Sequence, residues 1–339
     1  MAPDVAKGVP GSWGVLAIWA AGGLLSLCGA LGYAELASAY PRQGGDYVYL
    51  SRAYGRWAGF LFGWTQLTVV RPGDIAVMAF AFATYARTVY DPFAGLPVGF
   101  GQTMYAVGAT VLLTAINILG VREGKWAQNV LTVVKALGLL AIVGVAMSVP
   151  RGAPSSGHFD PLPLSVAMIL VLFTYGGWNE MAYVAAEVKR PQRNIIRALV
   201  LGTTAVTVLY LMVNGAFLYA LGHIGVATSE AVASDAVSAV FPRVAGRAVS
   251  VLVCLSALGA VNGLIFAGAR ISYAVGAEHR PLRLLGKWHP RTGTPVGAFG
   301  LATITSGAEE PARASTGAAK SSPDGCSSSR ASWSRARVS

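Results

Sequence analysis

Two adjacent glycines and two polar side chains interrupt an apolar segment that is long enough to cross a bilayer. The segment runs from Pro163 to Val188, and the interruption consists of Gly176, Gly177, Asn179 and Glu180. Glycine pairs let a helix unwind, and unwound backbone survives inside a membrane only where it faces protein or a water-filled cavity. The two half-helix ends would then offer opposite partial charges to a zwitterionic solute. The alternative is a glycine pair that lets two helices pack closely.

A lysine within another apolar segment is a second candidate for chemistry. Lys135 lies in the run from Val130 to Leu137. An ionisable side chain at membrane depth is costly to bury, so by default it marks a functional site. Alternatively, its ammonium reaches the cytoplasmic interface, which lies only a few turns away.

Four more charged residues fall in or beside apolar segments. Arg71 and Asp74 are three residues apart, so they share a helix face and are expected to neutralise one another, as a structural ion pair or as a functional one. Pro72 between them predicts a kink. Glu35 and Glu187 lie near cytoplasmic helix ends, and we expect them in an inner salt-bridge gate with nearby arginines rather than in a pocket.

A small polar pair near the end of the chain is also of interest. Asn262 and Gly263 predict close contact between helices, and a hydrogen bond beside a site is the alternative. The sequence contains no HExxH, no GxSxG and no second intramembrane aspartate spaced for a dyad, and its histidines and cysteines lack metal-ligand spacing. We therefore expect neither an enzyme nor a metal or cofactor.

Composition sets the class of protein. Of the 339 residues 54% are hydrophobic and 12% are charged, and the mean hydropathy is +0.54. A typical soluble domain is about a quarter charged, so these values predict an all-α, polytopic membrane protein. The net charge of +11 does not indicate nucleic acid binding, because the cations sit in short gaps and form no stripe on a polar helix.

The elements that must position these residues follow from the apolar runs. After a tail (1–12), expected to be extracytoplasmic, seven spans are predicted near 13–37, 57–85, 98–119, 130–149, 163–188, 198–221 and 249–275. An eighth begins at 296–304, which closes a transporter domain over 13–304. Residues 305–339 are rich in Ser, Ala and Arg, which predicts disorder. Cations concentrate in alternate gaps, such as 42–56 and 189–197, and this bias makes that side cytoplasmic.

Several motifs together are similar to one family. The sequence from about Pro10 to Gly300 resembles the amino acid, polyamine and organocation (APC) transporters, and most closely their L-type amino acid exchanger branch. The motifs are Leu31–Leu36, Pro41–Tyr49, Arg71–Gly73, Phe82–Tyr85, Phe173–Asn179 and Gly259–Gly263. The resemblance implies twelve helices, ten of them in two inverted five-helix repeats with broken helices at the substrate site. The spans here would then be helices two to eight and the start of nine, so we expect a fragment whose tail is out of frame.

The resemblance also implies roles for the broken segment. Phe173 would gate the substrate, and backbone carbonyls around Phe173, Thr174 and Gly176 would accept its ammonium. The implied binding segment comprises Phe173, Thr174, Tyr175, Gly176, Gly177, Trp178 and Asn179. Ordinary aromatic packing is the alternative for Phe173 and Trp178. Lys135 would stand where sodium-coupled relatives bind their cation, and its proton could be released during the cycle.

Two departures from the family pattern bear on function. Asp74 replaces a small polar residue, and the segment 87–96 has no cysteine, so no disulfide-linked glycoprotein subunit is expected there. We predict a plasma-membrane amino acid permease or exchanger for small or neutral L-amino acids, working by alternating access, with protons as a candidate coupling ion and the lipid bilayer as its surroundings. A polyamine or amine permease and a non-functional truncated membrane protein are the alternatives. The choice of amino acid, exchange versus uptake, and the oligomeric state are left open.

Overall fold

The computed structural model describes residues 1–93, 95–97, 99–119, 121–148, 158–238, 240–241, 245–279 and 282–286. All regular elements in these ranges are helices. Their order is α1 (Ala2–Lys7), α2 (Gly11–Ala39), α3 (Asp46–Tyr54), α4 (Arg56–Thr65), the π-turn η1 (Gln66–Val70), α5 (Arg71–Val89), α6 (Phe100–Leu119), α7 (Val121–Ser148), α8 (Leu164–Thr174), the 3-10 helix η2 (Trp178–Glu187), α9 (Pro191–Thr228), α10 (Val232–Ser238) and α11 (Ala245–Glu278).

The predicted membrane class is confirmed by the lengths of these helices. Among the described residues, six helical stretches are long and apolar enough to span a bilayer: Gly11–Ala39, Arg56–Val89, Phe100–Leu119, Gly124–Ser148, Pro191–Thr228 and Ala245–Glu278. The fifth predicted span, 163–188, corresponds to the pair α8 and η2. The predicted eighth span and the tail after it lie outside the described residues.

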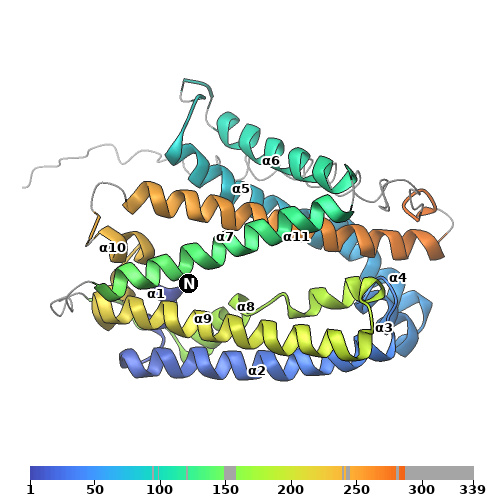
Figure 1. Ribbon diagram of the computed structural model, residues 1–339, viewed down its shortest axis with the longest axis horizontal. Helices are drawn as coiled ribbons and strands as arrows, with labels where there is room; N and C mark the ends of the chain where they lie inside the picture. Colours follow the sequence, from blue (N-terminus) through green and yellow to red (C-terminus); the bar gives the residue numbers. More distant parts are fainter. Residues whose placement is uncertain are drawn as a thin grey trace, which may run out of the picture.

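The long helices form two groups joined by α7 (Figure 1). Helices α2 and α9 run side by side with α8 against α2, whereas α5, α6 and α11 pack together on the other side. Helix α7 contacts both α9 and α11. Buried alanines such as Ala79 and Ala83 of α5 face Val261 and Ile265 of α11. Small residues let helix backbones approach closely in a membrane, where van der Waals packing drives association.

The discontinuous helix is present where the glycine pair predicts it. Helix α8 ends at Thr174, and η2 begins at Trp178. Gly177 adopts φ +100°, a left-handed conformation that side chains rarely tolerate. The second half is then wound as a 3-10 helix over ten residues. The span therefore changes from an α-helix to a 3-10 helix at the break.

Two other local features depart from simple helices. The π-turn η1 directly precedes Arg71 and Pro72, so the predicted kink takes the form of a wider turn. Pro72 has no N–H to donate, and a π-turn accommodates that loss without ending the helix. Residues expected to form a tail instead contain the short helix α1, whose Val5 and Ala6 are fully buried against other helices.

Candidate substrate site

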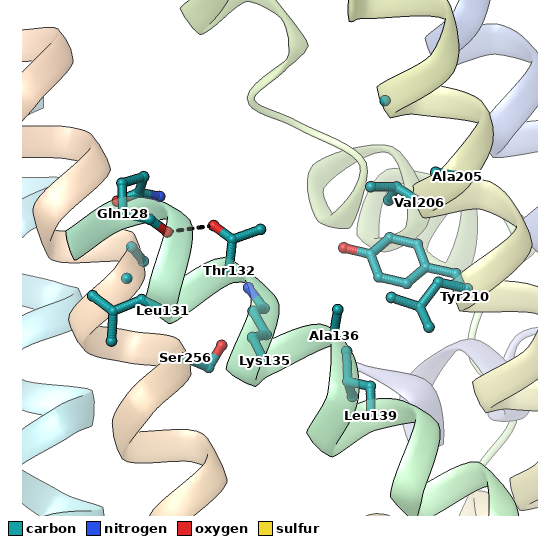
Figure 2. A pocket seen from close by; sticks show the side chains of 14 residues that line it. Gln128, Leu131, Thr132, Lys135, Ala136, Leu139, Ala205, Val206, Tyr210 and Ser256 are labelled. Carbon is teal, nitrogen blue, oxygen red and sulfur yellow. Dashed lines mark hydrogen bonds between the residues drawn. The ribbon is translucent and has the colours of Figure 1, made fainter. Parts of the chain in front are cut away.

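A cavity of about 450 Å³ lies between α7, α9 and α11, and Lys135 lines it. Its wall also includes Gln128, Thr132 and Ser256. Figure 2 shows Lys135 and Thr132 on α7 beside this space, with the hydroxyl of Tyr210 directed toward it from α9. Thr132 donates its hydroxyl proton to the Gln128 carbonyl at 2.8 Å, so it is occupied within its own helix. Most of the remaining lining is apolar.

Lys135 has no hydrogen-bonding or ionic partner among the described residues. The other described lysine of α7, Lys125, instead forms a salt bridge with Glu187 at 2.9 Å. An ammonium that lines a cavity without a counter-charge favours an anion, or a dipole that presents oxygen atoms, in that cavity. Lys135 therefore supplies the positive charge of this space.

A second cavity of about 270 Å³ lies at the break between α8 and η2. It is lined by Thr174, Gly176 and Gly177, and it shares Gly202, Val206 and Tyr210 of α9 with the first cavity. Tyr210 donates a hydrogen bond to the Thr174 carbonyl at 3.2 Å. The unwound backbone and Lys135 thus line two cavities that have part of α9 in common.

The seven residues of the predicted binding segment divide into two groups. Gly176, Gly177 and Phe173 are open, and the Phe173 side chain is 70% exposed. Tyr175 is buried instead, and it donates a hydrogen bond to the Trp19 carbonyl at 3.0 Å. Trp178 packs edge-on against Tyr33 of α2, with ring centroids 5.1 Å apart. Tyr175 and Trp178 therefore hold the break against α2, as the packing alternative expects for Trp178.

The carbonyl groups at the break are partly occupied. The Gly176 N–H donates to the Phe173 carbonyl at 3.1 Å, and Tyr210 donates to that of Thr174. Each carbonyl oxygen has two lone pairs, so both retain capacity for an ammonium donor. Thr174 uses its own hydroxyl to donate to the Leu170 carbonyl at 2.7 Å, and Asn179 is half-buried on the first turn of η2.

The prediction that Arg71 pairs with Asp74 is wrong. Arg71 is 6% exposed and forms a salt bridge with Glu180 of η2 at 2.8 Å, whereas Asp74 lies exposed on the same helix. Arg71 also donates to Gln66 at 3.1 Å. The local i, i+3 relationship favours Asp74, but the π-turn and η2 bring a more enclosed carboxylate to the guanidinium.

The expected ion pairing of Glu187 is present. Its two carboxylate oxygens accept from Arg270 at 3.0 Å and from Lys125 at 2.9 Å. Glu35, by contrast, is exposed and forms no salt bridge within the described ranges. Only one of the two acidic residues expected at the inner end is therefore paired there.

A buried amide chain connects the cavity to the helices behind it. Asn262 is fully buried and donates to Gln128 at 2.8 Å, and its own oxygen accepts from Asn117 at 2.6 Å. Gly263 lies beside the Gln128 amide, and a Cβ there would be 3.6 Å from its nitrogen, an ordinary van der Waals distance, so glycine is not required for this contact. Sequence reasoning missed Gln128 and Tyr210, since a polar residue on a helix and a tyrosine in an apolar run carry no distinguishing pattern.

Comparison with known proteins shows the family to which the chain belongs. The sequence profile of the family described as amino acid permease matches residues 1–308. The chain belongs to the amino acid permease family. As a member of that family it is a multi-pass membrane protein, in keeping with its apolar helices.

Individual members of the family are similar over most of this chain. The b(0,+)-type amino acid transporter 1 of Mus musculus is 32% identical over 84% of this chain and 60% of its own length. The serine/threonine exchanger SteT of Bacillus subtilis (strain 168) is 29% identical over 82% and 64%. The large neutral amino acids transporter small subunit 2 of Homo sapiens is 31% identical over 84% and 55%. The chain thus spans 55–64% of the length of these relatives.

Proposed function

We propose that this chain moves small or neutral L-amino acids across the plasma membrane by alternating access, either by exchange or by proton-linked uptake. The relatives named above are described as amino acid transporters and exchangers. The observation that carries the proposal is the break between Thr174 and Trp178, which opens beside a cavity inside a membrane-spanning segment.

The break suits both charged groups of an amino acid. Carbonyl groups at the end of α8 carry the negative end of a helix dipole and favour the ammonium, whereas N–H groups at the start of η2 favour the carboxylate. Gly176 and Gly177 have no side chains, so a solute can approach the backbone there. The substrate side chain would extend toward Val206 and Tyr210, which line both cavities.

Lys135 supplies the coupling charge in this proposal. Its ammonium stands in the cavity that adjoins the break, so a carboxylate or a released proton changes the charge balance of the whole region. In this proposal the positive charge of Lys135 takes the electrostatic role of a bound cation. The proposed partners are therefore an amino acid and, as the coupling ion, a proton.

No disulfide-linked glycoprotein subunit is part of the proposal. The connection between α5 and α6 has no cysteine, and the described cysteines Cys28 and Cys254 lie within long helices. The resemblance implies that animal L-type exchangers form their intersubunit disulfide in this connection. This chain has no cysteine there to which a subunit could be attached.

Uptake by the reconstituted chain tests this function. Proteoliposomes containing the chain would be loaded with unlabelled serine, leucine or buffer, and entry of the radiolabelled amino acid would be measured. We expect uptake that rises with internal amino acid or with an inward proton gradient. Uptake of putrescine without uptake of amino acids would support the polyamine alternative. A folded chain that moves neither solute would contradict the proposal.

A further inference from the structure

A basic cleft lies at the end of the molecule where the sequence predicts the cytoplasm. Its volume is about 780 Å³, and it is lined by Arg42, Arg52 and Arg56. These arginines come from the turn before α3, from α3 itself and from the first residue of α4. The far wall is the end of α11, including Tyr273 and Glu278. Three separate segments thus bring their guanidinium groups to one concave surface.

The positive charge of the cleft is not neutralised by the described residues. None of the three arginines has a carboxylate within salt-bridge distance among them. Glu278 also lines the cleft and accepts a hydrogen bond from Tyr47 at 2.7 Å, and its single negative charge stands against three positive charges. Arg52 lies over the ring of Tyr40 at 4.6 Å, a contact that orients the guanidinium without removing its charge. The cleft therefore has a net positive charge.

The surroundings of the cleft are those of a bilayer interface. Gly55, with φ +94°, turns the chain sharply between α3 and the membrane-spanning stretch that begins at Arg56. Next to this turn, Tyr54 and Trp57 are 68% and 70% exposed. Exposed tyrosine and tryptophan beside cations are typical of the level at which lipid headgroups lie. Beyond them, Leu61 is 57% exposed on the same helix as Trp57.

We propose that this cleft binds the phosphate-bearing headgroup of an anionic phospholipid of the cytoplasmic leaflet. Planar guanidinium groups match phosphate oxygens with paired hydrogen bonds. Ser51 and Gln43 in the lining add neutral polar groups. The acyl chains would run along the exposed apolar surface of α4. This site lies at the C-terminal end of α11, whereas the Lys135 cavity is lined by the middle of that helix, and the site does not depend on the proposed transport function.

Lipid retention in native mass spectrometry tests the site. The full chain, purified in detergent, would be offered phosphatidylglycerol or phosphatidylcholine with identical acyl chains. The cleft variant carries Arg42→Gln, Arg52→Gln and Arg56→Gln. The matched control carries Lys189→Gln, Arg193→Gln and Arg197→Gln, which remove the same charge from the same side at exposed positions outside the cleft. Thermal unfolding of each variant checks its folding.

We expect the unmodified chain and the control to retain phosphatidylglycerol in preference to phosphatidylcholine. Each arginine removed from the cleft should lower that retention by about five-fold, the effect of one cation near an anionic lipid. If the triple variant does not fold, the single Arg56→Gln variant gives the same reading. An equal loss in the control would mean diffuse attraction and overturn the site. If millimolar inorganic phosphate displaces phosphatidylglycerol from the unmodified chain, the cleft binds phosphate itself, and the lipid is overturned as its ligand.

Discussion

The guanidinium of Arg71 lies 2.8 Å from the carboxylate of Glu180, and this salt bridge ties α5 to the second half of the broken helix. Arg71→Met would remove a guanidinium whose side chain is 7% exposed and leave Glu180, which is 33% exposed, without its partner. Because only Arg71 is enclosed, we expect a loss of stability on the order of 2 kcal/mol, below the roughly 3–5 kcal/mol of a fully buried pair broken from one side. Thermal unfolding in detergent measures it.

The exposed pair Arg87–Asp91 provides the control for that prediction. Their side chains are 34% and 21% exposed at the end of α5, so Arg87→Met should cost less than about 1 kcal/mol. Equal losses for the two variants would show that the Arg71–Glu180 pair does not hold the broken helix.

Gly177→Ala tests the need for a left-handed residue at the break. A side chain at φ +100° costs about 1–2 kcal/mol, so the segment should shift away from its open conformation. We expect slower amino acid uptake with normal membrane insertion. Gly144→Ala is the matched control, because Gly144 lies within α7, about one turn before its end, with open space around its Cβ position. Unchanged uptake by Gly177→Ala would separate the break from transport.

Lys135→Ala removes the charge from the larger cavity. We expect uptake to fall roughly ten-fold, the effect of about 1.4 kcal/mol on the barrier to translocation. Lys189→Ala removes an exposed lysine outside both cavities and should leave uptake unchanged. If Lys135→Ala transports normally and its dependence on the proton gradient is also unchanged, Lys135 has no part in coupling.

Asp46 joins three segments through two short hydrogen bonds. Its carboxylate oxygens accept from Tyr33 of α2 and from Tyr183 of η2, each at 2.7 Å. Asp46→Asn replaces one acceptor by an amide donor, so one charge-assisted bond is lost and stability should fall by about 1.5–3 kcal/mol. Thermal unfolding checks this value. Tyr183→Phe should lower stability less in the Asp46→Asn background than in the unmodified protein, because both substitutions affect the same hydrogen bond. Fully additive losses of stability would contradict that bond.

We expect ionisation of the Tyr49 hydroxyl to destabilise the folded protein at high pH. Its hydroxyl is buried without a hydrogen-bond partner among the described residues, and burial together with the nearby charge of Asp46 raises its pKa from 10.0 to about 12. The folded state keeps this proton longer than the unfolded state, so stability from this group is complete below pH 10.0 and is lost as the pH rises toward about 12.

Tyr49→Phe should therefore stabilise the protein and reduce that alkaline loss. Removing an unsatisfied buried hydroxyl is expected to gain about 1 kcal/mol at neutral pH. Unfolding measured from pH 7 to pH 12 would show both effects. Tyr90→Phe, at a side chain that is 69% exposed, should show neither. A destabilised Tyr49→Phe variant at pH 7 would mean that the hydroxyl has a partner.

Sequence patterns predicted the spans and the break because both follow from local composition. Long apolar runs set the length of a helix, and Gly176 with Gly177 marks the place where it opens. The partner of Arg71 could not be predicted in this way, because Glu180 is 109 residues away and no local spacing rule reaches it. The part of α9 common to the two cavities was missed for the same reason, since Tyr210 reaches the Thr174 carbonyl across 36 residues of sequence.

The 3-10 helix η2 would become shorter if it rewound as an α-helix. Ten residues rise about 2.0 Å each in this form and about 1.5 Å each as an α-helix, so rewinding Trp178–Glu187 would shorten the segment by about 5 Å. Its far end is anchored through Glu187 to α7 and α11, so the shortening would draw the unwound backbone toward the cytoplasm. We expect two spin labels placed at the ends of η2 to show two different distances in the presence of substrate. A single distance would exclude this shortening.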